Sequence, residues 1–324
     1  MTILITGAAG FVALNVIEAL LATGREVVAF DRQAPPARAM AHFATLPGRL
    51  QIIEGDVRDP EALARAFAAA PIAAVLHAAA VTAGEDRERA DPETILDVNI
   101  RGGACVFRAA RAAGVARIVA PSSVAVYGAP PAGTPLLDEV TTPTSPQGLY
   151  AITKQASELA LLRLAALDPG ASLATPRLGM VYGPWEWATG VRDTLSPMLQ
   201  SLTCAEAGEE VLLNALATGD HVHVGDVAAG LVALLDEPAA QGVFNIGSGT
   251  ATTLADWCNA LAVHLPGFRW RMAGPGETAN TLTRQLKDRP PMAVERMRAA
   301  TGWRPRFGLA AGAAALVAWR AAHR

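Results

Sequence analysis

Short apolar runs alternate with longer amphipathic patterns up to about residue 178. Runs that predict strands lie at 3–6, 26–30, 50–53, 73–77, 117–121 and 172–178. Segments long enough for crossover helices lie between most of them, at 11–23, 60–69, 93–113 and 150–167. This alternation predicts a doubly wound parallel β-sheet with helices on both faces.

The pattern becomes irregular after Gly183. Residues 184–220 predict loops with a helix somewhere in 193–207, and a helix at 226–236 and a strand at 243–246 are expected to return to the sheet. Residues 249–324 predict short helices and Pro/Gly-rich loops. We therefore expect one domain from 1–178, rejoined by about 221–246, and a smaller lobe from 179–220 and 247–324.

Composition narrows the class of protein. With 324 residues, 51% of them apolar, the chain can bury the cores of two lobes. A net charge of −3 without a long basic run argues against a nucleic-acid surface. Cys105, Cys204 and Cys258 are far apart and lack metal-ligand spacing, so we expect buried thiols in a reducing compartment and no metal site.

The chain carries no strong signal for membrane insertion. Met1 leads directly into the apolar run at 3–5, without a basic region or cleavage site. Uncharged windows at 66–84 and 118–137 are broken by Pro or Gly and predict strands followed by loops. We expect a soluble, cytoplasmic protein.

The stretch "ILITGAAGFVALNVIEALLATGREVVAFDR" matches a dinucleotide fingerprint of strand, Gly-rich turn, helix and second strand. Gly7 permits the tight turn, and Gly10 lets the backbone approach a pyrophosphate at the helix N-terminus. Ala13 replaces the third glycine of the fingerprint. Asp31, at the end of the second strand, would accept hydrogen bonds from ribose hydroxyls and repel a 2′-phosphate, which favours NAD. The adjacent Arg32 leaves NADP as the weaker alternative. These features predict a Rossmann-type sheet.

Later strands end in residues that suit the same crevice. "GDVRD" follows the third predicted strand, and its Asp56 can bond an adenine amino group. "HAAA" follows the fourth, where Ala78, Ala79 and Ala80 leave room for the dinucleotide. His77, among apolar neighbours, suits a structural role better than a catalytic one.

Tyr150 and Lys154 lie one helical turn apart in "PQGLYAITK", so their side chains share a face. A solvated surface pair would have the same spacing. With "PSSVAVYG" (121–128) and "RLGMVYGP" (177–184), however, the chain resembles the extended short-chain dehydrogenase/reductase family, in its NAD-dependent epimerase/dehydratase group. The resemblance spans nearly the whole chain and includes "HVHVGDVAAG", "FNIGSG" and "TGWRPRFGLAAG".

The resemblance implies an oxidoreductase or epimerase of carbohydrate metabolism, with Tyr150 as acid/base. A free phenol has a pKa of about 10, and the charges of Lys154 and a nicotinamide ring are expected to lower it. Lys154 would also hold the nicotinamide ribose, Ser123 would bond the reacting oxygen, and Ser122 would line the cofactor. The remaining cofactor candidates are Ala9, Phe11, Val12, Val57, His77, Asn99, Gly179, Met180 and Val181, and the substrate candidates are Thr82, Ser123, Val124, Tyr150, Gly179, Trp185 and Arg192.

The motifs bear on three alternatives for the reaction. Dehydratases and some decarboxylating relatives carry acids where this chain has Val124 and Ala125, so elimination is not expected. Dehydrogenase and epimerase chemistry use the same residues. A non-catalytic NAD-binding regulator is a further alternative, which the intact Ser123, Tyr150 and Lys154 disfavour.

The substrate expectation rests on two departures from the family pattern. Members acting on nucleotide sugars usually carry an asparagine at the position of Met180 and an arginine at that of Gly219. Without these groups a buried diphosphate would be poorly neutralised, so we expect a sugar, sugar acid or polyol-like hydroxy acid, with a nucleotide sugar as the alternative. Residues 185–196 would close over it, and Arg192 would clamp a carboxylate. Arg192 could instead pair with Asp193 or Glu186 on the surface, and Arg284, Lys287 and Arg289 could supply other positive charge.

The resemblance also implies a homodimer. Helices at 93–113 and 150–167 commonly pair with their copies in the family. Candidate contact residues are Ile95, Val98, Val106, Ile152, Leu159 and Leu162, which could equally pack on the sheet.

Overall fold

A parallel sheet forms the centre of the computed structural model, which describes residues 1–190 and 192–323. Its strands follow the order β11-β7-β5-β4-β1-β2-β3, and β6 also pairs with β7. Every pairing in it is parallel. The strands are β1 (Thr2–Thr6), β2 (Glu26–Asp31), β3 (Arg49–Glu54), β4 (Ile72–His77), β5 (Arg117–Val119), β6 (Ser122–Ser123), β7 (Ser172–Leu178) and β11 (Gly242–Ile246). The predicted fold class is confirmed.

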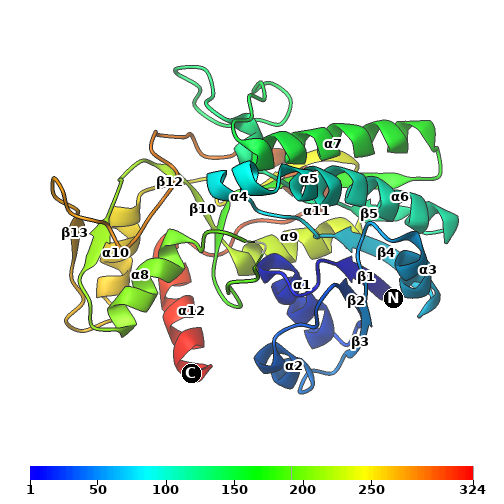
Figure 1. Cartoon of the computed structure of the whole chain (residues 1–324), viewed down its shortest axis with the longest axis horizontal. Coiled ribbons are helices and arrows are strands. Elements are labelled where there is room, and N and C mark those ends of the chain that lie inside the picture. The colour runs from blue at the N-terminus through cyan, green and yellow to red at the C-terminus, as the bar shows by residue number, and fades with distance from the viewer. Residues whose placement is uncertain (191, 324) are drawn as a thin grey trace.

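Helices cover both faces of this sheet (Figure 1). On one face α1 (Phe11–Ala22) packs beside α9 (Val224–Asp236), over a core that includes Ile3, Leu14 and Leu231. On the other face lie α3 (Pro60–Ala68), α6 (Gly102–Ala112) and α7 (Leu149–Leu167). The central strand β1 is buried along its whole length, and β2 is buried except at its two ends, in agreement with their continuous apolar runs.

The remaining chain packs beside the carboxyl ends of the strands (Figure 1). It contains α8 (Pro197–Glu206), α10 (Leu254–Ala262) and α12 (Leu309–Ala322) around the buried Trp257. Two small sheets join β12 (Ala251–Thr252), β10 (Gly219–His223) and β8 (Met180–Tyr182), and β13 (Trp270–Met272) with β9 (Val211–Leu213). In the part of the chain that the structure describes, no helix is long and apolar enough to cross a membrane.

Some predicted boundaries differ from the observed ones. The single helix expected at 93–113 is α5 (Pro92–Leu96), a π-helical turn at Asp97–Arg101, and then α6. The strand expected at 117–121 ends at Val119, because Pro121 has no N–H to donate to a neighbouring strand. The short helices α2 (Ala37–Phe43), α4 (Glu85–Ala90), α11 (Glu295–Thr301) and the 3₁₀ turn at Val124–Tyr127 have too few residues for a clear periodic signal.

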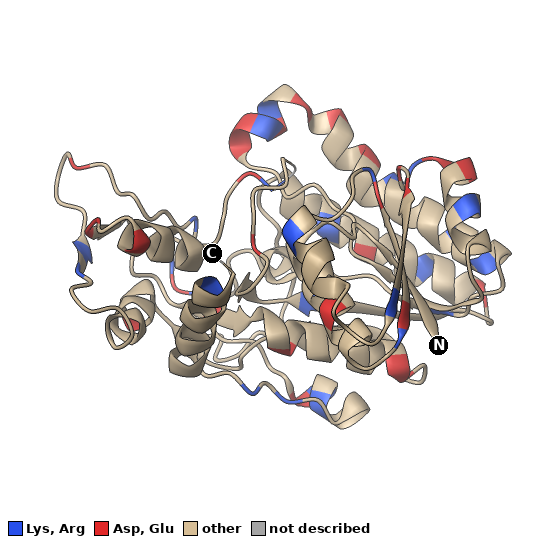
Figure 2. Cartoon of the chain, turned by 90° about the horizontal axis from the view of Figure 1, so that it is seen from below, with Lys and Arg blue, Asp and Glu red and all other residues tan. Residues whose placement is uncertain are grey.

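Several expectations about surface and core change with the fold. Ile95 and Val106 are fully buried within the chain, so they cannot contribute to a dimer contact. Ile152 and Leu159 are 45% and 58% exposed and remain candidates. Cys105 and Cys258 are buried thiols as predicted, whereas Cys204 is half-buried. Basic and acidic residues are interspersed along the ribbon (Figure 2).

A buried ion pair joins α7 to the sheet. Arg177 of β7 donates from Nη2 to Glu158 Oε1 at 2.6 Å and from Nε to Oε2 at 3.1 Å. The side chains are only 6% and 2% exposed. Because Tyr150 and Lys154 lie on the same helix, this pair also sets how their face meets the strand ends.

We predict that Glu158→Gln destabilises the fold, because the guanidinium of Arg177 would remain buried without a counter-charge. Breaking one side of a buried pair typically costs about 3–5 kcal/mol. Urea unfolding of the variant measures this loss. Asp236→Asn is the matched control, since its pair with Arg25 is partly exposed and such pairs contribute about 0–1 kcal/mol. Equal, small losses in both variants would contradict the structural role of Glu158.

Candidate active site

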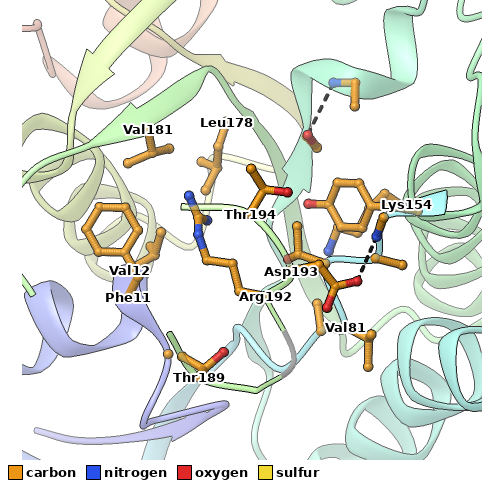
Figure 3. A pocket seen from close by; sticks show the side chains of 18 of the residues that line it. Phe11, Val12, Val81, Lys154, Leu178, Val181, Thr189, Arg192, Asp193 and Thr194 are labelled. Atoms are coloured by element: carbon orange, nitrogen blue, oxygen red, sulfur yellow. Dashed lines mark hydrogen bonds between the residues drawn. The ribbon is translucent and has the colours of Figure 1, made fainter. Parts of the chain in front are cut away.

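A cavity of about 1500 Å³ lies at the carboxyl ends of the central strands, between them and the smaller lobe. Ligands of open parallel sheets bind at this edge, because successive βα turns converge there. Figure 3 shows side chains around it from the start of α1, from β7 and β8, and from Thr189 and residues 192–194.

One end of the cavity is formed by the Gly-rich turn. Gly7 has φ of +69°, and a Cβ there would lie 2.5 Å from the backbone nitrogen of Ala79. Only glycine therefore lets the β1 turn approach the end of β4 this closely. Helix α1 begins directly after Gly10, with no side-chain cap and no acid in its first turn. Its first amides can therefore bind an anion.

Acidic residues line the same end. Asp31 closes β2, and its carboxylate accepts bonds from the N–H groups of Ala9, at 3.0 Å, and Arg32, at 2.7 Å. Burial raises the pKa of Asp31, although these bonds oppose the shift. Asp56 lies beyond β3 and pairs with Arg58 at 2.7 Å, so an adenine group would share that carboxylate.

Tyr150 lies in the first turn of α7 at the opposite end of the cavity. The helix begins after Gly148, which has φ of +79°, and the carboxylate of Glu88 accepts the Leu149 N–H at 2.7 Å. The hydroxyls of Ser123 and Thr82 lie near the Tyr150 phenol and act to lower its pKa. Ser123 follows β5 and Thr82 follows β4, so residues beyond two strands and the start of one helix form this site.

Within the protein itself, burial sets the direction of the Tyr150 pKa shift. Burial raises its pKa above 10.0, although the two hydroxyls and the charge of Arg192 act to lower it. Burial also lowers the pKa of Lys154 from 10.5 to about 8, and the charge of Glu158 opposes that shift. Lys154 is thus a cation at neutral pH whose charge is costly to keep buried.

All predicted cofactor and substrate residues line the cavity except His77, Asn99 and Trp185. His77 is buried in the sheet, where its Nδ1 bonds the Thr6 hydroxyl at 2.7 Å. Asn99 bonds both backbone groups of Val81, at 2.7 and 3.0 Å, and so supports the loop below the cavity. Trp185 is 2% exposed and packs against Trp319. These three side chains lie behind the cavity wall, and their assignment to the cofactor and substrate sets stays a prediction.

Arg192 reaches the cavity, but not as a free clamp. Its Nη2 donates to Glu186 Oε1 at 2.6 Å, and the Glu186 side chain is fully buried. Pairing with Glu186 was the alternative to the clamp, although it was expected on the surface. The buried position of Glu186 was missed, because nothing local distinguishes it from an exposed acid.

The residues present fit a dinucleotide. The uncapped start of α1 and Asp31 suit a pyrophosphate and a ribose. The Ser122 hydroxyl, which lines the cavity, is buried without a hydrogen-bond partner in the described chain. A buried hydroxyl of this kind requires a partner, and the ribose or carboxamide of a bound dinucleotide would supply one.

The site therefore defines a nucleotide-dependent oxidoreductase of the Rossmann class. A family model described as the NAD dependent epimerase/dehydratase family matches residues 3–247. The UDP-glucose 4-epimerase of Mycolicibacterium smegmatis is 30% identical over 320 residues, covering 98% of this chain and 97% of that protein. Sterol demethylase protein B of Methylococcus capsulatus is 26% identical over 264 residues, covering 74% and 76%.

A solved structure of this family has the same fold. The UDP-glucose 4-epimerase of Thermus thermophilus, in complex with NAD, superimposes with a TM-score of 0.80 at 28% identity, covering 99% of this chain and 100% of the other. The chain belongs to the NAD-dependent epimerase/dehydratase family, and the resemblance inferred from its motifs is confirmed.

We predict that folding stability rises with pH between about 8 and 10.5, in part through Lys154. In that window the unfolded chain keeps a proton that the folded chain has lost, so raising the pH favours folding. Lys154→Met should reduce this slope, measured by urea unfolding at several pH values. Lys287→Met, at an exposed lysine, should not. Identical slopes in wild type and Lys154→Met would exclude a depressed pKa.

Proposed function

We propose that the chain moves a hydride at a secondary hydroxyl carbon of a sugar, sugar acid or similar polyol-like substrate, with NAD as cofactor. The observation that carries this proposal is the convergence of Ser123, Tyr150 and Lys154 in the cavity that also contains the dinucleotide turn. A non-catalytic regulator would not need this constellation.

Tyr150 is the proposed acid/base. Its hydroxyl, which lies near those of Ser123 and Thr82, would take the proton of the substrate hydroxyl as the carbon–hydrogen bond breaks. The bound nicotinamide supplies the acceptor for the hydride. Because burial raises the Tyr150 pKa, nearby positive charge is required to favour the phenolate, and Arg192 and protonated Lys154 are its sources within this chain.

Ser123 is the proposed positioning group for the reacting oxygen. Its Oγ accepts the N–H of Ala125 at 3.2 Å, so the hydroxyl hydrogen stays available to donate to the reacting oxygen. Lys154 would bind the nicotinamide ribose, and Ser122 would bind the ribose or the carboxamide of the dinucleotide. Net oxidation requires the ketone and reduced cofactor to leave, whereas epimerisation returns the hydride to the opposite face of the same carbon.

A packed contact supports a substrate without a nucleotide. Met180 begins β8 and Gly219 begins β10, and the two strands are paired. A Cβ on Gly219 would lie within 1.9 Å of the Met180 Cε. The two departures from the nucleotide-sugar pattern are thus coupled, because the thioether fills the space that an arginine at 219 would need.

Arg289 favours the second candidate, a nucleotide-sugar epimerase. It lines the cavity, donates only a long bond of 3.3 Å to the Gly128 carbonyl, and leaves Nε buried without a partner in the described chain. Burial lowers its pKa, so an anion there would be stabilising. The UDP-glucose 4-epimerases among the relatives agree with this alternative.

The proposal also includes a homodimeric assembly and a cytoplasmic location. The exposed apolar side chains of Ile152 and Leu159 on α7 suit a homodimer contact, and apolar surface of this kind favours association. The free thiols fit a reducing cytoplasm.

We predict that Tyr150→Phe reduces hydride transfer by at least about 10²–10⁴-fold, because the proton has no acceptor. NAD affinity should stay nearly unchanged, since the ring is kept. Absorbance of reduced nicotinamide during turnover measures the first effect, and its accumulation or absence separates a dehydrogenase from an epimerase. A variant that keeps most of the wild-type rate would remove Tyr150 from the mechanism.

The substrate proposal is tested by thermal shift with NAD present. Free sugars and sugar acids should raise the Tm, because a ligand at 100 times its Kd adds about 2.7 kcal/mol to stability. Nucleotide sugars and a nucleoside diphosphate should not. The double variant Met180→Asn with Gly219→Arg should gain stabilisation by a nucleotide sugar. Clear stabilisation of the wild type by a nucleoside diphosphate would favour the second candidate.

A further inference from the structure

The chain between β8 and α8 crosses the cavity as a strap, defined as residues 184–190 and 192–196. Its first part is tied to α1 and the Gly-rich turn. Asn15 Nδ2 donates to the Pro184 carbonyl at 2.8 Å, and Trp187 Nε1 donates to the Ala9 carbonyl at 3.0 Å. Trp185 Nε1 donates to the Glu18 carboxylate at 2.6 Å. The strap therefore begins at the part of the cavity that suits a diphosphate.

The second part of the strap is tied to the loop that follows β4. The Asp193 N–H donates to the Thr82 carbonyl at 3.2 Å, and the Asp193 carboxylate accepts the Gly84 N–H at 2.8 Å. Arg87 adds an ion pair to Asp193 at 2.6 Å. The β1 turn and the loop after β4 flank the place of the dinucleotide, so the strap bridges it from one side to the other.

The strap begins with a strained residue. Trp185 has φ of +62°, the only positive φ at a non-glycine residue in the described chain. A bulky side chain rarely adopts this conformation, which costs on the order of 1–3 kcal/mol. Burial of the indole and its bond to Glu18 hold it in place. Strain of this kind is retained where a segment must follow a defined path.

Arg192 is the charged group that the strap holds over the start of α1. Its guanidinium carbon lies 5.4 Å from the centre of the Phe11 ring, and Phe11 is the first residue of α1. Glu186 holds Nη2, while Nε is buried without a partner in the described chain. In Figure 3 the side chain extends into the pocket between Phe11 and Thr194.

Arg192 and the first amides of α1 therefore present positive charge to the same part of the cavity from two sides. The α1 amides carry the positive end of the helix dipole, without an acid in the first turn. Glu186 balances the charge of Arg192 only from the side of the strap, because its other bonds go to the N–H and hydroxyl of Ser196. An anion between Arg192 and α1 would satisfy both groups.

We propose that Arg192 binds the diphosphate of the dinucleotide from the side opposite the α1 amides, and that the strap thereby retains the dinucleotide between turnovers. This inference rests on the proposed function in taking NAD as the dinucleotide. Retention favours the return of the hydride to the same substrate, which is epimerase behaviour. Arg192 is in this role a cofactor-binding residue and not the substrate clamp.

The test measures binding in the Tyr150→Phe protein, so that turnover does not contribute. Titration calorimetry gives the affinities of NAD, ADP, adenosine and UDP, and displacement of NAD gives its dissociation rate. Arg192→Gln should weaken ADP and NAD about 10–100-fold, as expected for a charge-assisted hydrogen bond, and leave adenosine unchanged. Most of the loss should appear as faster NAD dissociation. Arg192→Lys should fall between, and Arg163→Gln, an exposed arginine on α7, should match the parent.

Several results would overturn the proposal. One is equal ADP affinity with and without the Arg192 guanidinium, and another is an equal loss for adenosine, which would mean a general disturbance of the site. Weakening of UDP alone would assign Arg192 to the substrate. If Arg192→Gln does not fold, Glu186→Gln must reproduce the ADP-specific loss. If the ADP contact is lost as expected but no sugar is converted, the diphosphate site stands and the proposed function fails.

Discussion

Parallel pairing of β1 between β2 and β4 is the constraint on which the rest of the molecule depends. It places the ends of three buried strands at one edge, so that Gly7, Asp31 and Ala79 come together although they are far apart in sequence. The contact of Gly7 with the Ala79 backbone is possible only without a side chain. A larger residue would separate the Gly-rich turn from β4 and open the floor of the cavity.

The same constraint places the catalytic residues. Helix α7 crosses the other half of the sheet and is held there by the buried pair of Glu158 and Arg177. Tyr150 and Lys154 then face the strand ends, and the hydroxyls of Ser123 in β6 and of Thr82 in the loop after β4 lie near the phenol. Burial makes both ionisable groups resist their charged forms. A positive charge on a bound ligand would therefore favour the Tyr150 phenolate, and a negative charge would favour protonated Lys154.

Residues outside the central sheet complete the cavity. Met180 and Gly219 meet where β8 and β10 pair, and the end of the Met180 side chain occupies the space beside Gly219. The strap holds Arg192 through a carboxylate with no exposed surface. Both features lie outside the central sheet, where a family can change its ligand without disturbing that sheet.

The sequence by itself determined the parallel sheet, the dinucleotide turn and the Tyr150–Lys154 face, because each depends on local periodicity or on residues close in the chain. It also indicated Ser123 through a motif. It did not indicate which of the predicted site residues lie on the cavity surface and which, such as His77, Asn99 and Trp185, lie behind it. The direction of the Tyr150 pKa shift, the burial of Glu186 and the contact of Met180 with Gly219 were decided only by tertiary structure. The physical reason is that burial, charge pairing and close packing depend on which distant segments meet, and local sequence patterns do not specify that.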